Sequence, residues 1–94
     1  MIPSRPASER AADQIDRGLA AERLLGDAVV QAWFEQRVAE LTERMIAAPI
    51  SDDQTRRDCA ATITLVRQMK HELETEQTLG RKAAKDQERL KHGR

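Results

Sequence analysis

A short break between two helical stretches, AAPISDDQ at residues 47–54, constrains the fold of this chain most strongly. Pro49 disfavours the helical conformation at Ala48, so the preceding helix is predicted to end there. Ser51 and Gln54 match the S-x-x-Q form of a capping box, and the two aspartates between them lie where the helix dipole favours negative charge. Because the connection is so short, the two helices are predicted to fold back as an antiparallel hairpin.

Apolar residues repeat at helical spacing on both sides of this break. In the stretch 28–48 they fall within an arc of about 80° at 100° per residue. This stripe consists of Val30, Phe34, Val38, Leu41, Met45 and Ala48. In the stretch 52–79, which ends at Gly80, the corresponding stripe consists of Cys59, Thr62, Ile63, Val66, Met69 and Leu73, with Leu65 at its margin. We therefore predict an all-α fold built on two long helices.

A shorter and weaker helix is predicted for residues 9–25. The segment before it, residues 1–8, contains two prolines and is expected to be a flexible arm, with Ser8 as a candidate N-cap. Gly18 in the middle of this helix costs about 1 kcal/mol relative to alanine. The apolar stripe is thin, so this helix is expected to need a partner surface.

Gly26 and Asp27 predict a break between the first and second helices. Glycine is favoured just past a helix C-terminus because it adopts positive φ without a Cβ clash, and aspartate is a favoured N-cap. One continuous helix with an isolated glycine is the alternative interpretation.

The composition supports this architecture. Hydrophobic residues make up 39% of the 94 residues and charged residues 34%, whereas aromatic residues make up only 2%. Such a chain suits long exposed helices and lacks the aromatic and β-branched residues of a sandwich or barrel. A single helical domain over residues 9–80 is expected.

The charge is unevenly spread although the formal net charge is zero. Residues 81–94 contain six Lys or Arg against two Asp or Glu, whereas residues 1–80 contain ten against fourteen. This basic tail is either a helical extension or disordered, and by itself it is too short for a stable helix. It is either simply solvated or able to contact phosphates or an acidic protein. The candidate nucleic-acid contacts are Arg56, Arg57, Arg81, Lys82, Lys85, Arg89 and Lys91.

The residues that could carry catalysis or bind a metal have simpler interpretations. His71 and Glu72 begin like an H-E-x-x-H zinc motif, but Thr75 occupies the position of the second histidine. Cys59, the only cysteine, excludes an internal disulfide and lies on the predicted core stripe. The glycines are isolated, and a helical hairpin has no cleft to raise the pKa of a carboxylate. We expect no enzymatic activity, cofactor, metal or small-molecule substrate.

Protein–protein contact is the remaining class of function. A hairpin buries each helix on one side only, so apolar residues outside the stripes need cover from the first helix or from another chain. Trp33 lies about 60° beyond the edge of its stripe, and tryptophan is enriched at binding hot spots. The predicted contact set is Leu24, Leu25, Trp33, Phe34, Ile46 and Leu65.

The order of features over residues 20–80 resembles that of small α-helical accessory proteins from the structural and packaging gene clusters of tailed bacteriophages. The shared elements are the ERLL segment at 22–25 followed by the Gly26-Asp27 turn, a long amphipathic helix, a short acid-rich turn, and the TRRD run at 55–58 that opens a second long helix. The resemblance implies a small accessory part of a virion or of its assembly pathway, without catalysis, and it assigns no functional residue.

The expected function is therefore that of a non-enzymatic structural or assembly protein, in a phage head or head–tail context, acting through helix–helix contacts with itself or with other virion proteins. The first alternative is a nucleic-acid-binding packaging or regulatory protein that uses the basic tail. The second is a cytoplasmic helical adaptor or chaperone. No apolar run approaches the ~18 residues of a membrane span, and the N-terminus lacks a secretory signal, so the virion or the cytoplasm is the expected location.

Overall fold

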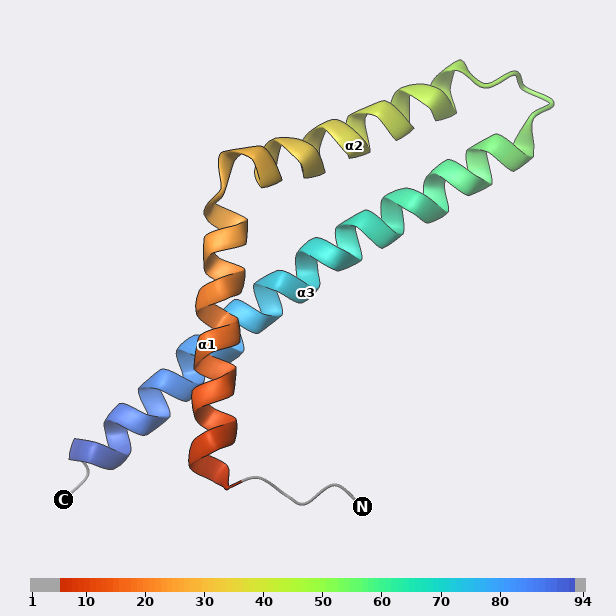
Figure 1. Ribbon diagram of the computed structural model, residues 1–94. Helices are drawn as coiled ribbons and strands as arrows, with labels where there is room; N and C mark the ends of the chain where they lie inside the picture. Colours follow the sequence, from red (N-terminus) through yellow and green to blue (C-terminus); the bar gives the residue numbers. More distant parts are fainter. Residues whose placement is uncertain (1–5, 93–94) are drawn as a thin grey trace. The chain divides into compact units, whose positions relative to one another are not determined.

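Three α-helices make up the computed structural model, which describes residues 6–92 (Figure 1). α1 spans Ala7–Gly26, α2 spans Ala28–Ala47 and α3 spans Asp53–His92. No strand occurs among the described residues, and the prediction of an all-α fold is confirmed. The predictions for residues 1–5 and 93–94 lie outside the described residues.

The chain divides into two compact units. One, called here the central unit, runs from Gly26 to Glu72 and contains α2 and the first part of α3. The other, called the terminal unit, combines the chain up to Leu25 with the chain from Leu73 onward, and so contains α1 and the second part of α3. Each unit has its own packing, and a single domain over residues 9–80 stays a prediction.

Asp27 separates α1 from α2 and caps α2. Its backbone is extended, with φ −74° and ψ 125°, and its Oδ1 accepts hydrogen bonds from the N–H groups of Val29 at 2.8 Å and Val30 at 3.1 Å. The predicted break and N-cap are confirmed. The expected positive φ at Gly26 is wrong, since no described residue has positive φ. The extended ψ of Asp27 by itself ends the helical conformation, and Gly26 is simply the last residue of α1.

The start of α1 also differs from the sequence prediction. The carbonyl of Pro6 accepts hydrogen bonds from the N–H groups of Glu9 and Arg10, both at 3.1 Å. α1 therefore begins at Ala7, and Ser8 lies in its first turn and is not the N-cap.

The connection between α2 and α3 ends α2 as predicted, but the N-cap of α3 is another residue than the predicted one. Ala48 has φ −63° and ψ 138°, the extended conformation that Pro49 imposes on it. The cap of α3 is Asp52, not Ser51: its Oδ1 accepts the N–H of Thr55 at 3.1 Å, and its Oδ2 accepts the Thr55 hydroxyl at 2.7 Å. These two bonds lower the pKa of Asp52, since they favour its charged form.

Arg56 holds this connection together. Its Nη1 donates to the carbonyls of Pro49 at 2.9 Å and Ala48 at 3.4 Å, and its Nη2 donates to the carbonyl of Ile50 and to Asp53 Oδ1 at 2.9 Å. The last carbonyls of a helix lack intrahelical partners, and a guanidinium with five donors can satisfy several of them. Arg56 thus ties the end of α2 to the start of α3.

The core of the central unit lies between α2 and the first part of α3. Leu41, Cys59 and Ile63 form a buried cluster, with Val38 and Met45 packed against it. Phe34 and Val66 are buried as well, so the predicted stripes supply the core. Two members of the predicted α3 stripe lie outside this core: Leu73 belongs to the terminal unit, and Met69 is 53% exposed. Met69 lies about 80° from Cys59 around the helix, at the edge of the buried arc.

The terminal unit is built on a direct backbone contact between two glycines. A Cβ on Gly18 would lie 2.7 Å from the Gly80 Cα and 3.0 Å from the Glu76 carbonyl oxygen. A Cβ on Gly80 would lie 2.7 Å from the Gly18 Cα and 3.0 Å from the Gln14 carbonyl oxygen. At these two positions the backbones approach so closely that neither helix has room for a Cβ.

The sequence alone suggests other roles for both glycines. Gly18 was expected only to weaken the first helix, and Gly80 was expected to end the third. Both are buried inside helices, and α3 continues through residues 81–92. The helical cost of glycine is accepted here because any side chain would keep the two backbones apart.

Polar side chains flank this contact. Glu76 accepts from Gln14 Nε2 at 3.0 Å, while Glu22 accepts from Arg81 Nη2 at 2.7 Å and from Gln77 Nε2 at 3.4 Å. The bonds from Arg81 and Gln77, together with the charge of Arg81, lower the pKa of Glu22. The stabilising effect of this group is present above the ordinary pKa of a glutamate and is lost as the pH falls through the lowered value.

We expect Gly18→Ala to destabilise the terminal unit although alanine is the better helix former. The added Cβ would meet the Gly80 backbone and force the helices apart, which costs about 1–3 kcal/mol in an overpacked core. Gly26→Ala is the matched control, because nothing lies within 4 Å of a Cβ at Gly26. The measurement is urea unfolding followed by circular dichroism. Equal stability of the two variants would contradict the proposed close contact.

A second pair of variants tests Arg56. Arg56→Ala should lower the free energy of unfolding by about 1–2 kcal/mol, because the Ala48 and Ile50 carbonyls lose their donor and Asp53 loses its ion pair, although the Pro49 carbonyl keeps the Asp52 N–H. Arg57→Ala should have almost no effect, since the Arg57 side chain makes a single contact, 3.5 Å from Gln54 Oε1. The same unfolding experiment compares them, and an Arg56→Ala protein as stable as Arg57→Ala would contradict the role of Arg56.

Candidate interaction surface

The only two aromatic residues form a pair that is divided between core and surface. The rings of Trp33 and Phe34 are edge-on, with centroids 5.3 Å apart and planes at 76°. Phe34 is buried at 8% exposure, whereas Trp33 is 49% exposed. Phe34 therefore anchors the pair in the central unit, and half of the tryptophan surface remains open to solvent.

Trp33 lines two hollows on the surface of α2. One, of about 400 Å³, is formed with Ala28, Val29, Ala32 and Gln36. The other, of about 320 Å³, is formed with Gln36, Arg37 and Glu40. Val29 lies one turn before Trp33 and is 78% exposed. The region around the indole is thus apolar toward the start of α2 and charged toward its middle.

Two more large apolar side chains of the central unit are exposed on α3. Leu65 is 60% exposed and Met69 is 53% exposed. They are four residues apart and so lie one above the other on the same side of the helix. The predicted contact set includes Leu65 but lacks Val29 and Met69. The signal for both was present, since each lies one helical turn from a residue of the predicted contact set.

The six predicted contact residues are divided between the two units. Leu24 and Leu25 belong to the terminal unit, where Leu24 is 46% exposed and Leu25 is half-buried. The other four belong to the central unit, but Phe34 is part of its core. Ile46 is 80% exposed, on another side of α2 from Trp33.

The predicted nucleic-acid contacts separate into two residues that join parts of the chain and five that are exposed. Arg56 binds the connection between α2 and α3, and Arg81 binds Glu22. The others are exposed: Arg57, Lys82, Lys85, Arg89 and Lys91. Lys82, Lys85 and Arg89 follow spacings of three and four residues, so they share one side of α3.

Among residues 6–92, no group of three or more His, Cys, Asp or Glu side chains could hold a metal ion. Cys59 is 3% exposed within the apolar cluster of the central unit, and His71 lies exposed on α3. Within the same described range, no helix combines the length and the apolar character that crossing a bilayer requires.

The exposed apolar and basic side chains are therefore the features on which a functional assignment depends. Models of known protein families, curated proteins and solved structures all gave no match to this chain.

Proposed function

We propose that this chain is a non-enzymatic helical assembly protein that acts by packing one apolar face of its central unit against a second copy of itself or another helical protein. The observation that carries the proposal is the half-exposed indole of Trp33 beside the buried ring of Phe34. Tryptophan is the residue type most typical of binding hot spots, and such anchors lie at the centre of an interface.

We infer that α2 and the first part of α3 pair in an antiparallel hairpin. Leu41 of α2 contacts Cys59 and Ile63 of α3, whereas the earlier residue Phe34 shares a groove with the later residue Val66. Contacts therefore move forward along α3 as they move backward along α2. The short connection from Ala48 to Asp52 supports the same arrangement.

This pairing places the exposed apolar side chains on one face. Glu35 and Arg67, which follow the core residues Phe34 and Val66, both line the same groove. In an antiparallel pair the residues that precede those core positions, Trp33 and Leu65, then share the opposite face. The same face includes Val29, one turn before Trp33 on α2, and Met69, one turn after Leu65 on α3. We call Val29, Trp33, Leu65 and Met69 the Trp33 face.

The charges beside the Trp33 face suit a second copy of the chain. Arg37 and Glu40 form an exposed ion pair, with Nη1 and Oε2 3.5 Å apart. Because both signs are present, two copies related by a twofold axis can exchange these partners across the interface. An exposed ion pair contributes little by itself, so burial of the apolar side chains is the main source of affinity.

The absence of enzymatic activity is part of the proposal. The Cys59 thiol is buried among Leu41 and Ile63, which suits a packing role and not that of a nucleophile. The resemblance of residues 20–80 to small helical proteins of tailed phages supports virion assembly as the setting. The virion or the cytoplasm of the cell that produces it is then the proposed location.

The basic stripe of Lys82, Lys85 and Arg89 favours one second candidate function. Three exposed cations on one side of α3 can neutralise neighbouring phosphates of a duplex. A packaging or regulatory protein that binds nucleic acid through this stripe is therefore the alternative, and it is compatible with assembly through the Trp33 face.

The proposed assembly predicts that Leu65→Glu weakens self-association by at least about tenfold, since a charge replaces an apolar contact in the interface. Solution mass measured across concentrations is the readout, with a shift of Trp33 fluorescence to shorter wavelength on association. Leu90→Glu is the matched control, because Leu90 is 81% exposed and lies outside the Trp33 face. A wild-type chain that stays monomeric up to about 1 mM, with no protein partner that Leu65→Glu weakens, would contradict the proposal.

The alternative predicts DNA binding whose affinity falls linearly with the logarithm of salt concentration. Fluorescence anisotropy with a labelled duplex measures it at several salt concentrations. Lys82→Glu combined with Lys85→Glu should abolish the binding, whereas Leu65→Glu should retain it. Failure of the wild-type chain to bind at low salt would exclude this function for the stripe.

A further inference from the structure

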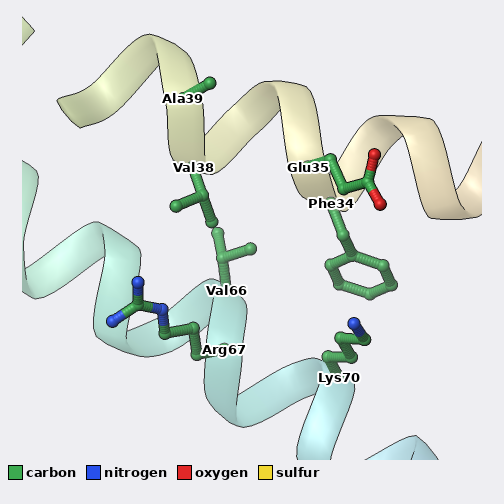
Figure 2. Close-up of a pocket in the computed structure, with 7 residues that line it drawn as sticks. All are labelled: Phe34, Glu35, Val38, Ala39, Val66, Arg67 and Lys70. Carbon is green, nitrogen blue, oxygen red and sulfur yellow. The ribbon is translucent and has the colours of Figure 1, made fainter. Parts of the chain in front are cut away.

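The face of the central unit opposite Trp33 carries a groove between α2 and α3. The groove has a volume of about 390 Å³ and is drawn in Figure 2. Its lining residues are Phe34, Glu35, Val38, Ala39, Val66, Arg67 and Lys70. All of them belong to the central unit, so the groove is a feature of that unit alone.

The floor of the groove is apolar. Phe34 and Val66 are buried and Val38 is half-buried. Figure 2 shows the side chains of Val38 and Val66 pointing toward each other from the two helices. Ala39 is small and exposed, which leaves the wall on the α2 side low. An occupant with branched apolar side chains can therefore reach the floor from that side.

The wall on the α3 side is positively charged. Arg67 and Lys70 are exposed and three residues apart, so two positive charges lie next to each other on one side of α3. Among the described residues, neither side chain makes an ion pair or a hydrogen bond. Glu35 on α2 is the one carboxylate in the lining.

We propose that this groove binds an amphipathic α-helix of a partner protein, with leucine-like residues over Phe34, Val38 and Val66 and with glutamate or aspartate along the flank that meets Arg67 and Lys70. A helix laid along two paired helices completes a three-helix arrangement, and its apolar residues at helical spacing match a groove of this kind. The acidic flank would supply the counter-charges that Arg67 and Lys70 lack.

The same features disfavour a nucleic acid at this groove. An apolar floor offers nothing to a phosphate backbone, and two cations release few counterions. Phe34 is buried and cannot serve as a stacking platform for a base. The proposal rests on the helix pairing of the central unit and not on self-association, since the Trp33 face lies on the other side.

The first experiment compares two designed peptides with the full chain. Each is a labelled helical peptide of about 18 residues with leucines at i, i+3, i+4 and i+7, and the flanking residues are glutamate in one and lysine in the other. Anisotropy titrations should give at least about tenfold tighter binding of the glutamate peptide, with the difference shrinking as salt is added. Equal binding of both peptides, or no binding of either up to about 1 mM, would overturn the proposal.

A charge exchange locates the site. Arg67→Glu combined with Lys70→Glu should reverse the preference, so that the lysine peptide binds more tightly. Lys82→Glu combined with Lys85→Glu makes the same change in net charge on exposed residues of α3 outside the groove, and should leave the preference unchanged. A preference that survives the first double variant, or that is lost in the second, would place binding elsewhere.

A third variant tests the apolar floor. Ala39→Leu should fill the groove from its low wall and weaken binding of the glutamate peptide by at least about tenfold, while circular dichroism shows unchanged helicity because Ala39 is exposed. Undiminished peptide binding by this variant would contradict the proposed binding site. Duplex DNA that binds at low salt and is lost with Arg67→Glu and Lys70→Glu would show a phosphate site instead and overturn the proposal.

Discussion

The backbone contact between Gly18 and Gly80 is the interaction on which the terminal unit depends. α1 fully buries only Gly18 and Ala21, and its large apolar side chains are at most half-buried. Two helices without a fully buried large side chain can gain close packing only if their backbones approach directly, and that requires glycine at both positions. The hydrogen bonds of Glu22 and Glu76 then help to fix the register of the two helices, which dispersion forces alone would not determine.

The central unit is held together by apolar side chains and not by a backbone contact. Its two faces differ because the residues before and after the core positions differ in chemistry. The residues before Phe34 and Val66 are apolar, namely Trp33 and Leu65. The residues after them are charged, namely Glu35 and Arg67. In the proposed antiparallel pairing, the two helices present an apolar face on one side and a groove with a basic wall on the other. The small core lies between them, with Leu41 and Cys59 as its most buried members.

Local chemistry explains what could be predicted from the sequence. Asp27 and Pro49 act within three residues of themselves, and the 3.6-residue period of apolar positions identified the core of α2 and of the first part of α3. Gly18 and Gly80 are 62 positions apart, and nothing local distinguishes a glycine that weakens a helix from one that lets another helix approach. Likewise, the preference for Asp52 over Ser51 as a cap depends on the hydroxyl of Thr55, which the S-x-x-Q pattern does not consider.

The contacts of Arg56 have a consequence for how this chain meets a protease. A tight turn between two helices is ordinarily the first place where a folded protein is cut, since its backbone can enter an active site as an extended strand. Here the carbonyls of residues 48–50 are held by one guanidinium that is itself part of α3. Cleavage at this turn then requires the end of α2 and the start of α3 to come apart together, so its rate reports the opening of the central unit and not the exposure of a loop.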